Sequence, residues 1–269
     1  MSTTQKIIKY LAIALAIFLL VGIIEGFLGV LGALGRLFSN DTVEKDIKSY
    51  TISSEIHSLE LQIGAAELRI EEGDCFSVTS NLKNLTVKES QGVLKIKERG
   101  TVYKSYLGAV MTVYIPKDAL LENVDITTGA GRVTVTQLSA ERLHWVLGAG
   151  QAEVQNLTVT RSADIHGGTG EITISDGALR DLELEMGIGQ LNLCAALTGE
   201  SELSLGIGES NITVIGDKND YQLDIEKGLG EMTLDGMSIG NIKEYGNGIH
   251  SIEISGGIGA VYISFAQAR

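Results

Sequence analysis

The alternation of apolar and polar residues along this chain is interrupted at regular intervals by a Gly-x-Gly triplet. Each triplet joins two stretches in which every second residue is apolar, and such period-two alternation predicts short, half-buried β-strands. The second glycines follow one another at spacings of 19, 20, 19, 19, 22 and 29 residues. A degenerate copy, IGAAELRI, occupies residues 63–70. The glycines of the seven triplets are Gly129, Gly131, Gly148, Gly150, Gly168, Gly170, Gly187, Gly189, Gly206, Gly208, Gly228, Gly230, Gly257 and Gly259.

Apolar residues fall in columns when the copies are aligned on the second glycine. In the copy centred on Gly170 these residues are Ala163, Ile165, Ile172 and Ile174, at positions −7, −5, +2 and +4. The inward parity changes across the triplet, because −5 and +2 are an odd distance apart. Glycine allows such a corner, since it reaches backbone conformations closed to other residues. We therefore interpret both glycines of each triplet as a structural corner between two strands.

Copies that align in columns predict stacking of like on like. The expected fold is all-β, a β-solenoid or β-helix-like stack of about 19–20-residue coils over residues 123–265, with neighbouring strands about 4.8 Å apart. A twisted antiparallel meander is the alternative. Residues 51–122 also contain strand-like runs, but residues 71–122 do not follow the repeat. We expect residues 51–122 to form an N-terminal β region that caps the open edge of the stack.

The N-terminal part of the chain is predicted to form one transmembrane α-helix at residues 6–38. From Ile7 to Ile24 only Lys9 is not apolar, and apolar residues continue to Phe38. This exceeds the ~20 residues needed to cross a bilayer. The run is longer than a usual signal-peptide core and no clear A-x-A site follows it, so an uncleaved signal anchor is favoured over a cleaved signal peptide.

The charges that flank this segment predict its orientation. Lys6 and Lys9 lie at its start, so the positive-inside bias places a stub of residues 1–5 in the cytoplasm. Residues 39–50 form a polar connector, and the body would lie outside a cell membrane that the chain crosses once.

Small residues share one face of the predicted helix. Gly22, Gly26 and Gly29 form a small-xxx-small pattern that lets helices approach closely and predicts helix-mediated self-association, aided by a hydrogen bond from Glu25. Alternatively the span ends near Ile24 and Glu25 is already interfacial, since a glutamate inside a bilayer is costly.

The charge of the chain argues against nucleic-acid partners. The formal net charge is −13, and residues 1–36 contribute three cations and one anion, or +2, which leaves −15 on the remainder. A body this acidic repels nucleic acid and anionic lipid headgroups.

The cysteines and histidines show no metal-ligand spacing. Cys75 and Cys194 do not form a CxxC, and they are either one disulfide in an oxidising compartment or two isolated core residues. The four histidines are far apart in the sequence, so each is expected to be a single surface or core residue. The glycine triplets do not extend to GxGxxG, a P-loop or a calcium-binding nonapeptide. We expect no cofactor and no catalytic residue.

One outward column of the repeat is acidic. Seven of the eight residues six positions before each second glycine carry a carboxylate: Glu60, Asp125, His144, Asp164, Glu183, Glu202, Asp224 and Glu253. Stacked coils would align these groups in a ladder. It is either a charged face that resists aggregation or a surface that holds divalent cations weakly or docks a basic partner, with Asp164, Glu183, Glu202 and Asp224 central.

These residues resemble a known family. The order LTVKESQGVLKIKE, then TVYIPKDALLENVDITTGAGRVTV, then recurrent xGxGxhxh (h, apolar) is similar to that of the bacterial β-strand-repeat proteins labelled "putative adhesin", a toastrack-like group of unknown function. The likeness covers residues 50–265. It implies a cell-envelope protein with an N-terminal membrane segment, in some relatives encoded near envelope-stress signalling systems, and it carries no catalytic motif.

Two functions of different classes follow. The first is a non-catalytic, membrane-anchored envelope protein that displays a rigid β-repeat body to an envelope protein or a cell-wall component, for binding or envelope-stress signalling. The alternative is a β-solenoid enzyme acting on cell-wall polysaccharide with acidic surface dyads. The single Trp falls in an inward column, and glycan clefts usually need aromatic side chains beside the carboxylates, so the first function is favoured.

Overall fold

The computed structural model describes residues 43–99 and 108–267, and within these ranges the chain is all-β, as predicted. The one helical element there is the 3₁₀ turn η1 (Lys218–Asp220). Among the described residues no helix is long and apolar enough to cross a membrane. The transmembrane helix predicted at residues 6–38, with Gly22, Gly26 and Gly29, lies outside the described residues.

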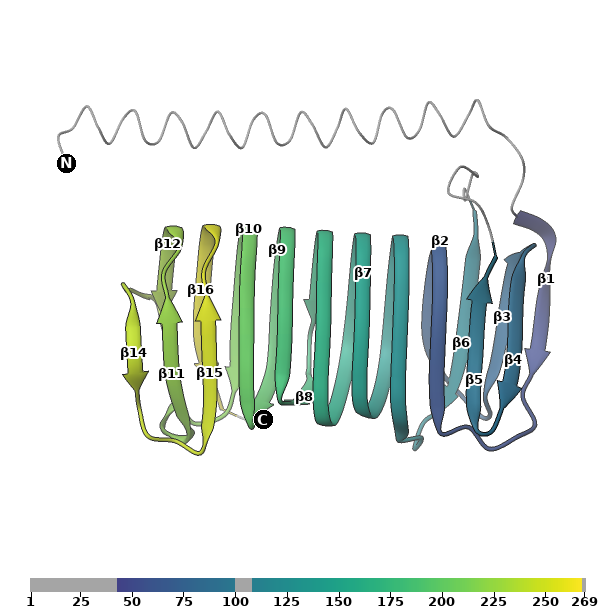
Figure 1. The fold of residues 1–269 in the computed structure, drawn as a ribbon, viewed down its shortest axis with the longest axis horizontal. Coiled ribbons are helices and arrows are strands. Elements are labelled where there is room, and N and C mark those ends of the chain that lie inside the picture. Colours follow the sequence, from purple (N-terminus) through teal and green to yellow (C-terminus); the bar gives the residue numbers. More distant parts are fainter. Residues whose placement is uncertain (1–42, 100–107, 268–269) are drawn as a thin grey trace, which may run out of the picture. The chain divides into compact units, whose positions relative to one another are not determined.

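Sixteen strands are present in the described ranges (Figure 1). They are β1 (Val43–Thr51), β2 (Ser58–Gly73), β3 (Ser77–Leu82), β4 (Leu85–Ser90), β5 (Val93–Glu98), β6 (Val110–Pro116), β7 (Leu121–Ile174), β8 (Gly177–Arg180), β9 (Leu182–Thr198), β10 (Glu200–Ile215), β11 (Tyr221–Glu226), β12 (Leu229–Leu234), β13 (Met237–Ser238), β14 (Ile242–Tyr245), β15 (His250–Ser255) and β16 (Ile258–Ala266).

Each coil of the repeat consists of two strand segments joined at the glycine corner. We call the segments before the corner the first layer and those after it the second layer. β9 and β10 each contain one such coil, and they pair in parallel so that Glu183 lies beside Glu202 and Gly189 beside Gly208. Figure 1 shows the coils side by side, with the chain running along one side of each coil and returning along the other. Pairing between coils is thus parallel. A solenoid requires this arrangement, and it rules out the antiparallel meander.

The corner is a place where only glycine fits. Gly189 has a φ of +145°, a backbone conformation that L side chains rarely adopt, and a Cβ on it would stand 1.7 Å from the carbonyl oxygen of Gly170 in the preceding coil. A Cβ on Gly187 would stand 2.3 Å from the carbonyl oxygen of Gly168. The same approach recurs from coil to coil, because each corner stacks directly on the previous one.

The core lies between the two layers and is formed by the apolar columns. Ile165 and Leu184 of the first layer and Leu191 of the second are essentially inaccessible to solvent, and the only Trp, Trp145, is buried among them. Ser201 is a polar exception in this core, and its Oγ lacks a hydrogen-bond partner among the described residues. Each coil therefore contributes a few apolar residues to one continuous hydrophobic core.

The stack begins earlier than residue 123. The degenerate copy in β2 pairs in parallel with the first coil of β7 through both layers, from Ser58 beside Asn123 to Ile70 beside Val135. β5 and β6 pair in parallel with the other side of β2. β4 then pairs antiparallel with β5, β3 with β6 and β1 with β3. The irregular residues after β2 therefore cover this end of the stack.

The C-terminal end departs from chain order. β15 and β16 pair with β10 on one side and with β11 and β12 on the other. The last coil along the chain therefore lies between the two coils that precede it in the sequence. The 29 residues from Gly230 to Gly259 are enough for the chain to return from β12 to a position beside β10. The short strands β13 and β14 then pair antiparallel with β12 and β11 and close this end.

Candidate functional site

The acidic column lies on the outer face of the first layer. Its members alternate with buried residues, as Glu183 does between Leu182 and Leu184. Each strand places the next carboxylate beside the last. The register partners run from Asp164 to Glu183, Glu202, Glu253 and Asp224 in spatial order.

The two ends of this column differ in charge balance. Near the N-terminal end Glu60 forms a salt bridge with Lys95 of β5. Towards the C-terminal end the carboxylates are exposed, and no ion pair to them is found among the described residues. We call this surface the acidic face, and its members are Glu183, Glu200, Glu202, Asp224, Glu226 and Glu253.

Carboxylates that lie in register on neighbouring strands repel one another. Neighbouring strands stand about 4.8 Å apart, where two like charges repel by roughly 1 kcal/mol in water, and salt reduces this further. The repulsion is tolerable, and the summed field attracts cations and basic surfaces.

The four residues that the sequence placed at the centre of a cation surface do not form one cluster. Glu183 and Glu202 are neighbours, but Glu253 lies between Glu202 and Asp224, and Asp164 turns to a different set of partners. The prediction assumed that copies adjacent along the chain are adjacent in space. A single line of exposed carboxylates also lacks the six to eight converging oxygens that calcium takes.

Asp164 is held by two histidines. Its Oδ2 lies 2.7 Å from Nδ1 of His144 and its Oδ1 lies 2.7 Å from Nε2 of His166, while Nδ1 of His166 lies 3.0 Å from Oε2 of Glu185. The two imidazole rings meet edge to face with their centroids 5.8 Å apart. The expectation that the histidines stand singly is therefore wrong for His144 and His166. The two histidines are 22 residues apart, which is one coil of 20 residues plus two. This spacing could have predicted that they lie close together on neighbouring coils.

The outer face of the second layer has a different character. Guanidinium and amide N–H groups donate to side-chain oxygens from coil to coil, with Arg132 to Gln151 at 2.9 Å, Asn192 to Thr173 at 3.2 Å and Asn211 to Asn192 at 3.0 Å. These side chains satisfy one another from coil to coil, and an open hollow of about 330 Å³ on the same face is lined by Glu153, Glu171 and Thr173.

Ionisation is perturbed at the C-terminal edge of this second face. The charge of Glu231, with burial and the charge of Glu209, raises the pKa of Tyr262. The Tyr262 hydroxyl therefore remains a neutral hydrogen-bonding group beside these two carboxylates.

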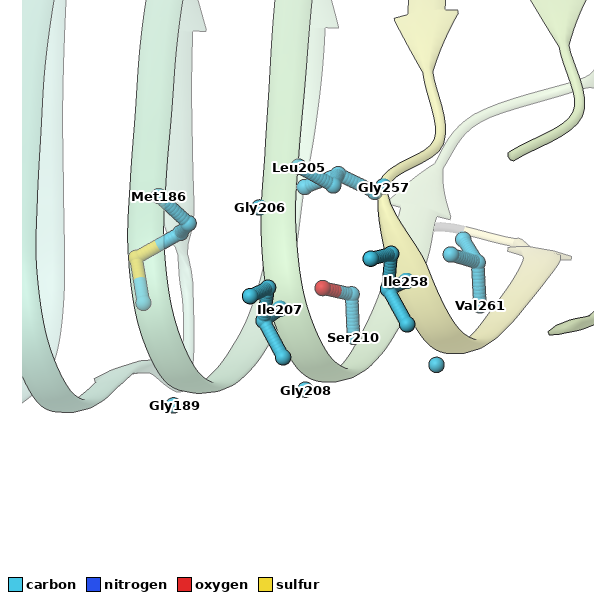
Figure 2. A pocket seen from close by; sticks show the side chains of 11 residues that line it. Met186, Gly189, Leu205, Gly206, Ile207, Gly208, Ser210, Gly257, Ile258 and Val261 are labelled. Carbon is cyan, nitrogen blue, oxygen red and sulfur yellow. The ribbon is translucent and has the colours of Figure 1, made fainter. Parts of the chain in front are cut away.

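The glycine corners carry a narrow gap rather than a ligand cavity. It is lined by residues that include Met186, Leu205, Ser210, Ile207 and Ile258, and the last two stand side by side in neighbouring coils (Figure 2). The gap has room for about one water molecule, so it is too small for an organic substrate.

The two cysteines are apart and unpaired. Cys75 is exposed and Cys194 is half-buried, and both are free thiols. Neither is the fully buried core residue that one of the two sequence interpretations expected, and neither contributes to the acidic face or the histidine pair.

Comparison with known proteins finds a matching family model and several solved structures that resemble the chain distantly. A sequence model of the family described as Toastrack DUF4097 matches residues 56–242. A "putative cell adhesion protein" from Clostridium sporogenes is 15% identical, with a TM-score of 0.37 over 82% of this chain and 99% of that one. A "putative adhesin" from Bacteroides fragilis is 12% identical, with a TM-score of 0.45 over 82% of this chain and 98% of that one.

A third structure carries a different description. A "putative lipid binding protein" from Parabacteroides distasonis is 14% identical, with a TM-score of 0.31 over 82% of this chain and 98% of that one. No curated protein matches the chain. Likenesses this distant carry no argument about function.

Proposed function

Because the chain belongs to the Toastrack DUF4097 family, whose β-stack here presents an acidic face, we propose that it is a non-catalytic envelope protein that binds a basic partner through that face. In this proposal the residues before the body anchor it in the cell membrane by a single helix, with the body outside. The partner is an envelope protein or a wall component that carries positive charge. Envelope-stress signalling would then depend on occupancy of this face.

The observation that carries the proposal is the register of carboxylates to which the described part of the chain supplies no ion pair. Four strands in succession place Glu183, Glu202, Glu253 and Asp224 side by side, all exposed. Like charges across a strand pair are unfavourable, and the fold gives no packing reason to keep them there. A surface charge pattern of one sign favours association with a partner of the other sign.

A catalytic role on polysaccharide receives no comparable support. The only Trp, Trp145, is buried in the core, whereas binding surfaces for sugar rings usually present aromatic side chains beside their carboxylates. We therefore propose binding without turnover.

Binding to a decalysine peptide tests the acidic face. In the full-length protein, replacing Glu183, Glu202 and Glu253 together with Gln should weaken binding at low salt by roughly tenfold, since each exposed ion pair contributes about 0.5 kcal/mol. The control replaces Glu72, Glu209 and Glu231, which lie in the second layer and remove the same charge. Equal losses in the two variants would mean that only net charge matters and that the acidic face is merely a solvated surface.

Protease treatment of intact cells tests the proposed orientation separately. The positive charges before the predicted span place the body outside, so added protease should degrade it without lysis. A body that is protected until the membrane is opened would contradict the orientation while leaving the peptide-binding result unaffected.

A further inference from the structure

Four side chains from three successive coils converge at the edge of the acidic face. His144 comes from one coil, Asp164 and His166 from the next and Glu185 from the third, and all four point outward from the first layer. The strand register produces this meeting, because Asp164 pairs with Glu183 and His166 with Glu185.

Both ring nitrogens of His166 face a carboxylate oxygen. Glu185 accepts only, so the Nδ1 of His166 facing it at 3.0 Å must carry the proton. In the neutral imidazole Nε2 then presents its lone pair to Oδ1 of Asp164, 2.7 Å away. Two acceptors cannot hold each other at that distance. Either a proton, held by the ring or by the carboxyl group, or a metal ion must lie between them.

One oxygen of the Asp164 carboxylate is favourably placed for a cation. Oδ1 of Asp164 is closed off from solvent and has no hydrogen-bond partner of acceptable geometry among the described residues, although His166 Nε2 is close to it. A buried acceptor left unpaired is costly, and a cation placed between Oδ1 and Nε2 would satisfy both.

The donor set is one that transition metals prefer. One ligand atom each from His144, Asp164 and His166 can be chosen so that all lie within 4.8 Å of one another. Zinc binds imidazole nitrogen at about 2.0–2.1 Å and carboxylate oxygen at about 2.0–2.2 Å, so tetrahedral ligand atoms stand roughly 3.3 Å apart. The two contacts of 2.7 Å, which run to different oxygens of Asp164, would each open by about 0.6 Å on binding a zinc ion.

Glu185 completes the arrangement from outside the ligand set. Metal-bound histidines usually donate their other ring N–H to a carboxylate, which fixes the tautomer and the ring orientation. Its contact with Nδ1 of His166 leaves Nε2 free to ligate.

We propose that His144, Asp164 and His166 bind a divalent transition-metal ion of the zinc type, with Glu185 holding His166 in its ligating tautomer. Two imidazoles and one carboxylate leave a coordination position for water or for a group of a partner. The proposal does not depend on the peptide-binding role of the acidic face, because none of these four residues was assigned to that face.

Calorimetric titration of the metal-stripped, full-length protein with zinc chloride tests the site. We expect one zinc per chain, with Asp164→Asn and His166→Gln each weakening binding about 100-fold or more, as loss of one of only three ligands should. Glu185→Gln should weaken it by about 10–100-fold, as loss of an outer-shell carboxylate does. Glu183→Gln, in the same column one coil away, is the matched control and should change affinity less than about threefold.

Cobalt(II) provides a readout that a general loss of folding would not imitate. The cobalt-loaded wild type should show ligand-field absorption that disappears in His144→Gln, while the circular dichroism spectra of both proteins remain the same. Zinc affinity that is unchanged in Asp164→Asn and His166→Gln would overturn the proposal, and so would equal competition by magnesium. Absence of zinc binding in the wild type would also overturn it, and an ion pair between a protonated His166 and its carboxylates would then explain the cluster.

Discussion

The central coils and the C-terminal end of the stack use the same repeat but relate chain order to spatial order differently. From β7 to β10 each coil lies beside its chain neighbour, and residues 19 or 20 apart become partners. At the C-terminal end the last coil is inserted between its two predecessors. Register alone therefore determines which side chains meet, and chain order is a guide only where the coils are equally spaced.

The two regions also differ in what they can tolerate. A central corner is enclosed by backbone on both sides, as Gly189 is by Gly170 and Gly208. The C-terminal end is closed by short antiparallel strands and a two-residue turn, Asp235-Gly236, whose positive φ values of 50° and 76° are typical of tight hairpins. Changes in the centre should therefore affect neighbouring coils, and changes at the end should remain local.

The largest effect is expected from Gly189→Ala. The added methyl would meet the Gly170 carbonyl at 1.7 Å in a backbone conformation closed to alanine, so we expect a loss of roughly 3 kcal/mol or more in the free energy of unfolding. Gly240→Ala is the control, because nothing lies within 4 Å of its Cβ position. Urea denaturation measures both, and equal midpoints would contradict the stacked corner.

A smaller effect is expected from Asp235→Asn at the C-terminal end. Burial alone would raise the pKa of Asp235, but hydrogen bonds from Lys218 and the Phe265 amide, together with the Lys218 charge, lower it. A lowered pKa in the folded state contributes stability above the ordinary pKa of an aspartate, and that stability is lost as the pH falls through the folded-state value. The pair is partly exposed, so we expect only about 0.5 kcal/mol.

Thermal melting at neutral and acidic pH checks this second prediction. Asp235→Asn should melt below the wild type at neutral pH and together with it in acid. Asp118→Asn, an exposed carboxylate elsewhere, should match the wild type at neutral pH. A difference between wild type and Asp235→Asn that grows as the pH falls would refute the assignment.

The sequence predicted the repeating core but not the meeting of side chains across coils. Alternation around each triplet is a local property, so the inward positions of Ile165 and Leu184 could be read directly. The insertion of β15 and β16 depends on which strand edges form the more stable pairing, and the sequence does not show this. The 29-residue spacing shows only that the chain has enough residues between the two corners to pass back. His144 and Asp164 occupy the same column of neighbouring coils. His166 follows Asp164 by two residues, so its closeness to His144 can be predicted only once the coil length of 20 residues at this point is known.

Disulfide trapping across the acidic face tests the register most directly. In a Cys75→Ser, Cys194→Ser background, Glu202→Cys with Glu253→Cys places two cysteines on adjacent strands with Cα atoms about 4.8 Å apart, within disulfide reach. Glu202→Cys with Asp224→Cys places them two strands apart, at roughly 10 Å, which is too far. Mass spectrometry after mild oxidation should find the first crosslink and not the second. The second crosslink without the first would show that the coils stack in chain order and would contradict this account.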